Sequence, residues 1–559
     1  MTALFAIAIV LGVQIFRPGC VRLTVWASFE KADLLDQIAS DYEKTRPSLD
    51  LRCVDVVVHR KASGEAEVAL ARGWQTSDGP RPDVWSPAAT TWVALLDRQR
   101  AESRKPAIVP SATPSIMQSP LVIAMPEPMA KALGWPTKDI AWSDIFALAQ
   151  DPRGWSAYGH PEWGRFKLGK TNPLISTSGL HILLATYRAA PAGDTEDPRV
   201  RAFLRGVEQS VVHYGDTVAT FNKNLADADD RGEGLSYVSA IAMEEKQVWD
   251  YDQGNPDFRP APTRLPPNVK LVAVYPREGT LVADHPYVVL GEDWVDEQKR
   301  LAASLFLAHL RSDAVQQRLL SNAFRGHRGE VGTPIRQATE LDASKPSTVF
   351  PLPDPATLQR MQASWTEFRK RARVMMIIDV SSSMGERVAG SLSKLELARQ
   401  AASAALDQFA PDDEVSLWTY AAPPYREVVS LGPIREQKAL LRSEIERLGP
   451  QASAKALYAT LTAAVTTLRQ RFDRDRINAV LVLTDGRNDD PTNNDLNGLL
   501  RSLRGQPEDE RIRVFTVGYG ARADLDALER IARASRGASY EASDPRVIDR
   551  VLAAVVSNF

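Results

Sequence analysis

A short acidic and hydroxyl-rich motif follows an apolar run in the last third of the chain. Asp379, Ser381 and Ser383 form an Asp-x-Ser-x-Ser sequence at the end of the run VMMIID, and a second run, AVLVLTDG at 479–486, carries Asp485. Carboxylate and hydroxyl oxygens are hard ligands that suit Mg2+ or Mn2+. If both runs are parallel strands of one sheet, their carboxyl ends meet at the edge where α/β sheets bind ligands. These four side chains are therefore predicted to form one site.

The order of these segments resembles the von Willebrand factor A domain and its metal-ion-dependent adhesion site. The resemblance covers about residues 373–559, and a later run, RVFTVGYG at 513–520, agrees with it. It implies a doubly wound α/β domain. In that family, the Asp-x-Ser-x-Ser residues, a Thr on another loop and the Asp of the TDG strand hold the metal. A carboxylate of a partner protein completes the coordination. The resemblance thus implies an Mg2+ or Mn2+ cofactor and a protein partner that the sequence does not identify.

One position departs from the family pattern, which resembles Gly-x-Thr-x-Leu-Tyr. This chain has Ala-Lys-Ala-Leu-Tyr at 454–458, so Lys455 takes the place of the Thr. A protonated ammonium group cannot bind a metal, and it is attracted to carboxylates. Two arrangements remain open. Lys455 fills the cation site and pairs with Asp379 and Asp485, or it points outward while Ser453 supplies the missing hydroxyl and the metal stays.

Small hydroxyl residues stand at several expected helix starts in the first half of the chain. Ser28 precedes a helical stretch at 30–43, Ser63 precedes another at 65–73, and the loop STSG at 176–179 opens a third. Helix N-termini offer free N–H groups and the positive end of a dipole. Each is explained as a plain helix cap when taken alone. Together they would suit a polar or anionic small ligand if they converge.

The segments from about 21 to 340 resemble a type II periplasmic solute-binding protein. The stretches 115–136 and 166–187 resemble its second lobe, and 271–290 resembles the return to the first lobe. The likeness is greatest to the molybdate and sulfate binders, in which an Asn-Pro-x-x-Ser/Thr-Ser-Gly loop opens a helix at the ligand. The resemblance implies capture of a small polar or anionic solute in the cleft between the lobes. The implied ligand residues are Ser28, Ser63, Ser86, Ser119, Thr177 and Ser178.

Other residues of this module bear on the kind of solute. Lys170 and Arg165 would supply positive charge for an anion. Three tryptophans could instead stack on an organic solute, although packing in the core explains them equally well; they are Trp85, Trp155 and Trp163. Glu244 and Glu245 are interpreted as charges near a helix N-terminus, where a negative charge interacts favourably with the helix dipole.

The N-terminus and the two cysteines predict an exported protein. Residues 2–16 carry no charge and are about as long as the core of a signal peptide, which favours an export signal or a single membrane anchor. Cys20 follows this run and could carry a lipid. Alternatively, Cys20 and Cys53 form a disulfide, because both stand at the start of runs that read as adjacent parallel strands. We expect an extracytoplasmic protein that is membrane-anchored or secreted.

The chain is predicted to be α/β throughout, with a two-lobed module followed by a doubly wound domain. The expected parts are a signal or anchor at 1–20, a solute-binding module at 21–342, a linker at 343–372 and a von Willebrand A domain at 373–559. Within the module, the first lobe is expected at about 21–113 and 271–342, and the second at about 114–270.

Composition and motifs favour a binding protein over an enzyme. The 559 residues include 68 Lys plus Arg and 70 Asp plus Glu, and the net charge of −2 argues against nucleic acid as a partner. The sequence has no HExxH, P-loop or GxSxG motif, so no catalytic residue is assigned. We expect solute capture by the first module and binding of a protein partner by the second. The alternatives are a solute receptor of an ABC transporter with an accessory domain, and a hydrolase that uses the cleft.

Overall fold

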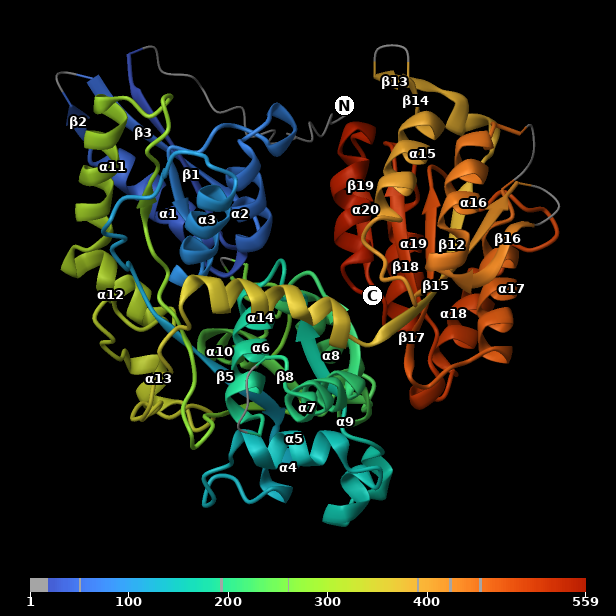
Figure 1. The fold of residues 1–559 in the computed structure, drawn as a ribbon, viewed down its shortest axis with the longest axis horizontal. Helices are drawn as coiled ribbons and strands as arrows, with labels where there is room; N and C mark the ends of the chain where they lie inside the picture. The colour runs from blue at the N-terminus through green and yellow to red at the C-terminus, as the bar shows by residue number, and fades with distance from the viewer. Residues whose placement is uncertain are drawn as a thin grey trace, which may run out of the picture.

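The computed structural model forms three α/β bodies, and Figure 1 shows them as two lobes with a third domain beside them. It describes residues 19–49, 52–191, 195–259, 261–389, 392–421, 425–451 and 455–559. The apolar run at 2–16 lies outside these ranges. Within them, no helix combines the length and the apolar character needed to cross a bilayer.

Lobe 1 is built on a five-stranded sheet in the order β11-β4-β1-β3-β2. The central strand β1 pairs in parallel with β3 and β4, and its Leu23 and Val25 are fully buried because helices cover the sheet. The strands are β1 (Val21–Ala27), β2 (Ser48–Leu49), β3 (Arg52–Arg60), β4 (Val84–Ser86) and β11 (Val288–Val289). The helices are α1 (Phe29–Lys44), α2 (Ser63–Arg72), α3 (Thr90–Glu102), α11 (Glu297–Leu310) and α12 (Asp313–Ser321).

Lobe 2 is built on a six-stranded sheet in the order β10-β5-β8-β6-β7, with β9 also paired to β5. The strands are β5 (Ser119–Pro126), β6 (Leu168–Thr171), β7 (Val211–Gly215), β8 (Ala240–Glu244), β9 (Leu271–Val274) and β10 (Val282–Ala283). The helices are α4 (Glu127–Ala132), α5 (Trp142–Gln150), α6 (Thr177–Ala189), α7 (Pro198–Gln209), α8 (Val218–Asp229), α9 (Gly234–Tyr237) and α10 (Glu245–Asp252).

The expected return to lobe 1 at residue 271 is wrong. Strand β9 begins there but pairs antiparallel with β5, opposing Val274 to Ile123, and β10 also pairs with β5. The chain re-enters lobe 1 only near β11. It leaves again after α12, since Ala323 and Ile335, the latter on α13 (Thr333–Gln337), pack into the core of lobe 2. The second part of lobe 1 therefore runs from about 284 to 322.

The expected linker at 343–372 contains a packed helix, α14 (Pro355–Phe368), which crosses both lobes (Figure 1, yellow). Asp354 caps its N-terminus by accepting hydrogen bonds from two backbone amides. Its buried face includes Leu358 and Trp365 and contacts α3 of lobe 1 and α6 and α7 of lobe 2. The prolines thus mark only the approach to α14, and the amphipathic run that follows them is part of the packed structure.

The C-terminal domain has a six-stranded sheet in the order β16-β15-β12-β17-β18-β19. All its neighbours pair in parallel except the edge strand β16, so β12 is central and the strand order reverses beside it. The strands are β12 (Arg371–Asp379), β15 (Glu414–Tyr420), β16 (Arg426–Pro433), β17 (Arg476–Thr484), β18 (Arg513–Tyr519) and β19 (Ser539–Ala542). The helices are α15 (Lys394–Ala405), α16 (Ile434–Arg447), α17 (Leu457–Gln470), α18 (Leu496–Arg504), α19 (Leu525–Ser535) and α20 (Ile548–Val556).

Lobe 2 and the C-terminal domain are held together by polar contacts. Arg533 on α19 donates two hydrogen bonds to Asp227, at 2.6 and 2.7 Å. The Tyr214 amide donates to the carbonyl of Asn558 at 3.1 Å. Charge-assisted, two-point contacts of this kind fix orientation as well as distance. The two modules therefore share a defined interface.

Candidate functional site

The Asp-x-Ser-x-Ser motif lies where the sequence places it, at the carboxyl end of β12. Asp379 is fully buried, and its Oδ1 accepts a hydrogen bond from the Ser381 amide at 2.8 Å. Its Oδ2 accepts hydrogen bonds from the hydroxyls of Tyr420 and Thr484 at 3.1 and 3.0 Å. Burial and the adjacent Asp379 carboxylate raise the pKa of Tyr420 well above its usual value, so its hydroxyl stays a donor. Protein donors thus already surround the Asp379 carboxylate.

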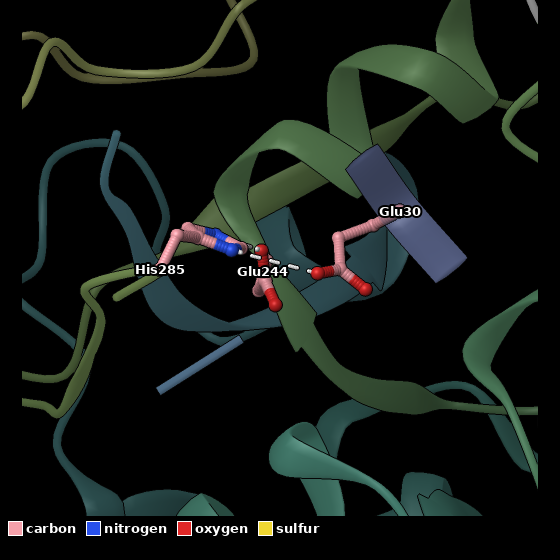
Figure 2. A group of neighbouring side chains, drawn as sticks. All are labelled: Glu30, Glu244 and His285. Atoms are coloured by element: carbon pink, nitrogen blue, oxygen red, sulfur yellow. Dashed lines mark ion pairs between the residues drawn. The ribbon is translucent and has the colours of Figure 1, made fainter. Parts of the chain in front are cut away.

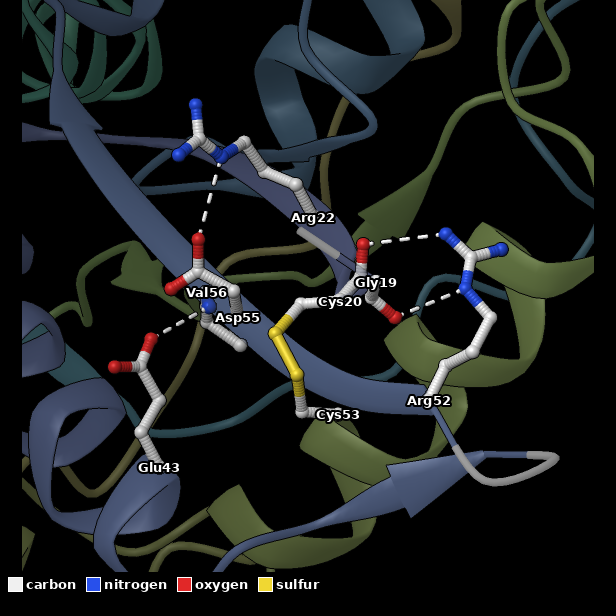
Figure 3. The surroundings of a disulfide bond; sticks show 8 residues. All are labelled: Gly19, Cys20, Arg22, Glu43, Arg52, Cys53, Asp55 and Val56. Atoms are coloured by element: carbon white, nitrogen blue, oxygen red, sulfur yellow. Dashed lines mark hydrogen bonds and ion pairs between the residues drawn. A yellow bond between two sulfur atoms is a disulfide. The ribbon is translucent and has the colours of Figure 1, made fainter. Parts of the chain in front are cut away.

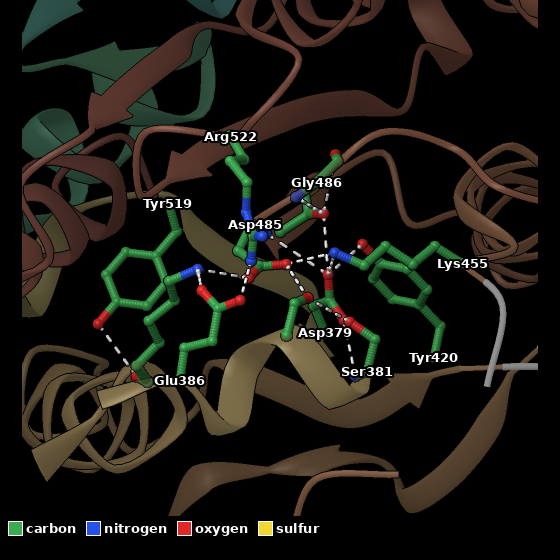
Figure 4. A network of polar contacts seen from close by, with 12 residues as sticks. Asp379, Ser381, Glu386, Tyr420, Lys455, Asp485, Gly486, Tyr519 and Arg522 are labelled. Atoms are coloured by element: carbon green, nitrogen blue, oxygen red, sulfur yellow. Dashed lines mark hydrogen bonds and ion pairs between the residues drawn. The ribbon is translucent and has the colours of Figure 1, made fainter. Parts of the chain in front are cut away.

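Two lysines contact the second carboxylate of the site, Asp485. Figure 4 shows one of them, Lys455, beside it. Lys394 Nζ lies 2.8 Å from Asp485 Oδ2, and Lys455 Nζ contacts Oδ1 while lying 3.7 Å from Asp379 Oδ2. The Ser383 hydroxyl donates to Oδ1 at 2.8 Å. Burial alone would raise the pKa of Asp485, but the hydrogen bonds from Lys394 and Lys455 outweigh it and lower the pKa.

These residues do not fit a resident Mg2+ or Mn2+ ion. The expected Thr ligand is Lys455, whose ammonium group occupies the space between the two carboxylates. Lys394, at the start of α15, adds a second positive charge on Asp485, and no motif in the sequence marked it. A divalent ion would have to displace or neutralise these ammonium groups. Ser453, the alternative hydroxyl, lies outside the described residues.

An open surface surrounds this carboxylate pair; we call it the adhesion-type face. It lines a cavity of about 820 Å3 between the Asp-x-Ser-x-Ser loop, the loop after β17 and residues 521–523. Arg487 and Arg522 project from it with side chains 80% and 61% exposed. Arg522 pairs with Glu386, which also contacts Lys394 at 3.0 Å. Exposed guanidinium groups beside internally compensated carboxylates suit contact with acidic groups.

A second candidate site is a small cavity between lobes 1 and 2, which we call the cleft cavity. It has a volume of about 40 Å3, space for a few water-sized groups. Four of the six predicted ligand residues line it, Ser28 and Ser63 from lobe 1 and Thr177 and Ser178 from lobe 2. The lobes touch here, because the Gly64 amide donates to the carbonyl of Ile175 at 2.9 Å. The helix starts therefore converge.

The other two predicted ligand residues, Ser86 and Ser119, do not line the cleft cavity. The Ser86 hydroxyl is fully buried and donates to the Pro286 carbonyl at 2.8 Å. Ser119 is also buried, and its Oγ accepts a hydrogen bond from the Lys246 amide at 3.3 Å, near the start of α10. The Ser119 side chain also forms a hydrogen bond with Glu244, so it lies next to a residue that lines the cleft cavity, whereas the Ser86 hydroxyl bonds to the backbone inside lobe 1.

The charge of the cleft cavity is opposite to the expected one. Lys170 is buried against Glu208, and Arg165 lies in a different pocket. The expectation that they supply positive charge to the solute is therefore wrong. The charged side chains that line the cavity are Glu30, Asp216 and Glu244, and none of the described lining residues is Lys or Arg. Trp85, Trp155 and Trp163 do not line it and are buried in the core.

Glu30 and Glu244, which line the cleft cavity, lie beside His285 (Figure 2). His285 Nδ1 lies 3.5 Å from Glu30 Oε1, and His285 Nε2 lies 3.4 Å from Glu244 Oε2. One potential metal-ligand atom from each residue lies within 4.8 Å of the other two. Glu244 Oε2 and His285 Nε2 have no hydrogen-bond partner in the described part of the chain. This cluster joins lobe 1, which contributes Glu30 and His285, to lobe 2, which contributes Glu244.

Burial controls the protonation of this cluster. It raises the pKa of Glu244 to about 8, although Lys31 and Lys246 act in the opposite direction. It lowers the pKa of His285 to about 3, so this imidazole is neutral. Lys31 Nζ lies 3.0 Å from His285 Nδ1 and donates to the Pro87 carbonyl at 2.8 Å. Burial also lowers its pKa, to about 8.

Cys20 and Cys53 form a disulfide at the start of lobe 1 (Figure 3). The bond ties the beginning of β1 to the beginning of β3, where the strands are parallel neighbours. Arg52 donates to the carbonyls of Gly19 and Cys20 at 3.1 and 3.2 Å. In this form the Cys20 sulfur is not free to carry a lipid.

Comparison with known proteins agrees with both folds. A family model described as bacterial extracellular solute-binding protein matches residues 23–325, and a von Willebrand factor type A model matches residues 374–554. The uncharacterized protein Rv1836c of Mycobacterium tuberculosis is 24% identical over 523 residues, which cover 91% of this chain and 72% of that protein.

Two solved structures align with parts of the chain. The sulfate-binding protein SubI of Mycobacterium tuberculosis aligns at 15% identity with a TM-score of 0.35, covering 55% of this chain and 86% of that one. A von Willebrand factor type A protein from Catenulispora acidiphila aligns at 20% identity with a TM-score of 0.28, covering 34% and 42%. The chain belongs to the bacterial extracellular solute-binding protein family and carries a C-terminal von Willebrand factor type A domain.

Proposed function

We propose that this protein captures a small, positively charged solute in the cleft cavity and binds a protein partner through the adhesion-type face. The family is one of extracellular solute-binding proteins, which indicates an extracytoplasmic location. The observation that carries the solute proposal is the lining of the cleft cavity. Both lobes contribute hydroxyls to it, and its ionisable side chains are three carboxyl groups.

The solute class follows from the charge and the size of the cleft cavity. An oxyanion would meet Glu30, Asp216 and Glu244 without a cationic side chain among the described lining residues. A cation would instead pair with Glu30 and Glu244, and the neutral His285 lies next to both carboxyl groups. Two carboxylates and an imidazole suit a divalent metal such as Zn2+ or Mn2+. A volume of about 40 Å3 also favours an ion or a small amine over a sugar.

Equilibrium titration with small cations tests directly whether the solute is positively charged. We expect Mn2+, Zn2+ or methylammonium to bind the full chain at one site. We expect Glu244→Gln to weaken that binding at least about tenfold, because it removes one of the two carboxyl groups that would hold the cation. Glu127→Gln serves as the matched control, since Glu127 pairs with Lys131 on the surface of α4 and does not line the cleft cavity. Equal binding by the wild type and the Glu244 variant would contradict the assignment.

The adhesion-type face is proposed to bind an acidic partner without a metal ion. Lys455 provides positive charge where family members hold a metal, and Arg487 and Arg522 project beside it. A carboxylate of the partner can reach these three groups as charge-assisted hydrogen-bond donors. The face is also open to solvent, so an acidic side chain of a partner can enter its cavity.

Cross-linking in the native host, followed by mass spectrometry, tests the partner proposal. The wild type should capture a protein in the presence of EDTA, and the Arg487→Glu/Arg522→Glu double variant should not. Arg501→Glu is the control, because its side chain is 72% exposed on α18, away from this face. Capture that is abolished by EDTA would refute binding without a metal.

Attachment to the membrane by the N-terminal segment is part of this proposal. Residues 2–16 are uncharged, and the disulfide at Cys20 would tie such an anchor to lobe 1. Fractionation of the host with and without residues 1–18 tests it. A truncated protein that stays in the membrane fraction would contradict anchoring by this segment.

A further inference from the structure

A third cavity lies between lobe 2 and the C-terminal domain, and we call it the inter-module pocket. Its volume is about 390 Å3, enough for a small metabolite. Lobe 2 contributes the end of α5, the segment before β6 and the start of β7. The C-terminal domain contributes the loop before β17 and the start of β18, at the sheet edge opposite the adhesion-type face. The pocket is therefore distinct from both sites above.

The lining of the inter-module pocket is strongly cationic. Seven Lys or Arg residues and four Asp or Glu residues line it among the described residues. Three of the four acids are already paired. Asp151 contacts Arg153, Glu508 contacts Arg511, and Asp509 contacts Lys167. Only Asp475 is left without an ion pair within the described part of the chain.

Several of the cationic groups have hydrogen-bonding capacity that the described residues do not fill. Arg165 and Arg474 form no hydrogen bond or ion pair with the described residues, although both line the pocket. Arg513 is only 7% exposed. Its guanidinium lies 3.9 Å from Glu508, which also pairs with Arg511, and its Nε has no hydrogen-bond partner among the described residues. Lys370 Nζ contacts only carbonyl oxygens, those of Gln209 and Val211 at 3.3 and 3.1 Å. Its desolvation and the nearby Arg513 lower the pKa of Lys370 to about 8.

A buried guanidinium N–H without a partner is costly, and a cluster of like charges raises that cost. An anion in the pocket would accept hydrogen bonds from these N–H groups and would offset the repulsion between the like charges. Its oxygens could reach Arg165 from lobe 2, Arg474 and Arg513 from the C-terminal domain, and Lys370 from the segment between α14 and β12. Arginine is well suited to phosphate and carboxylate groups because its N–H donors are fixed in a planar fork.

We propose that the inter-module pocket binds a small multivalent anion, bearing phosphate or several carboxylates, that bridges lobe 2 and the C-terminal domain. The anion contacts both sides of the interface, so it stabilises the arrangement in which Arg533 pairs with Asp227. The proposal is independent of the solute in the cleft and of the partner of the adhesion-type face.

The test uses the full chain with pyrophosphate and citrate as probes, titrated by calorimetry at constant ionic strength set with sodium chloride. We expect saturable binding of at least one probe with one site per chain. Arg165→Gln and Arg474→Gln, which change exposed side chains on opposite sides of the pocket, should each weaken binding about tenfold. Arg501→Gln, with a 72% exposed side chain outside the pocket, is the matched control and should leave affinity unchanged.

Two results would overturn the proposal. One is the absence of saturable binding of either probe at millimolar concentration. The other is equal binding by the wild type and both pocket variants, which would place the anion elsewhere. The cleft variant Thr177→Val separates this site from the cleft cavity, since it should bind the probe as the wild type does.

Discussion

Replacing Lys455 by Thr restores the residue that the metal-binding family has at this position and removes one ammonium group from Asp485. Removing one partner of a buried ion pair costs about 3–5 kcal/mol when the remaining charge is left alone. Here Lys394 and Ser383 stay in contact with Asp485, and the Lys455 side chain is 15% exposed. We therefore expect a smaller loss of about 1–2 kcal/mol. At about 2–4 °C per kcal/mol for a domain of this size, the melting temperature of the C-terminal domain should fall by about 2–8 °C.

The same variant should respond to Mg2+ in a way that the wild type does not. The new hydroxyl completes the family's ligand set, so an ion can bind where the ammonium group lay. A ligand at 100 times its Kd stabilises a protein by about 2.7 kcal/mol, which would recover the loss. Differential scanning calorimetry of the full chain in EDTA and in MgCl2 measures both effects. Lys438→Thr is the matched control, because Lys438 pairs with Asp407 on the surface. Stabilisation of the wild type by Mg2+, or an unchanged melting temperature of Lys455→Thr in EDTA, would refute the reasoning.

Three further perturbations follow from the structure. The pKa of Glu244 is raised to about 8, so below that pH a proton competes with a cation for its carboxylate. In calorimetric titrations the cation affinity should fall about tenfold for each pH unit from pH 7 to pH 5, and Glu244→Gln should reduce this dependence on pH. The disulfide closes a separation of 33 residues, so the Cys20→Ser/Cys53→Ser variant should lose about 3–4 kcal/mol of unfolding free energy in urea, and an unchanged midpoint would contradict this. Trp365 on α14 is 2% exposed, so Trp365→Ala should cost about 3–5 kcal/mol in the same assay, whereas a loss below 1 kcal/mol would mean that α14 is only a tether.

The sequence predicted what depends on local patterns. The apolar runs before Asp379 and Asp485 have the pattern of buried parallel strands in a doubly wound sheet. Leu457 and Tyr458 match the family pattern, and this match placed Lys455 at the metal-ligand position. Lys394 was missed because it lies at the start of a helix that approaches Asp485 only after the sheet is assembled.

The wrong lobe boundary and the wrong charge of the cleft in the first module also come from contacts between segments that are distant in the sequence. The pairing of β9 with β5 joins segments about 150 residues apart, and no local pattern determines such pairing. Glu244 was interpreted as a helix-start charge. It does precede α10, but closure of the lobes brings it to Glu30 and His285. Hydroxyls such as Ser28 and Thr177 were found because capping residues are visible in the sequence, whereas the acidic character of the cavity depends on tertiary contacts.

The central claim is that the cleft cavity binds a cation rather than an anion. The most direct test measures the binding of Mn2+ and of sulfate to the wild-type chain and to a Glu30→Gln/Glu244→Gln variant. The account predicts one tightly bound Mn2+ per wild-type chain, its loss in the double variant, and no sulfate in the cleft cavity. Sulfate binding that is lost in Thr177→Val but retained in Glu244→Gln and in Arg474→Gln would contradict it, because that pattern would place an anion among the hydroxyls of the cleft cavity.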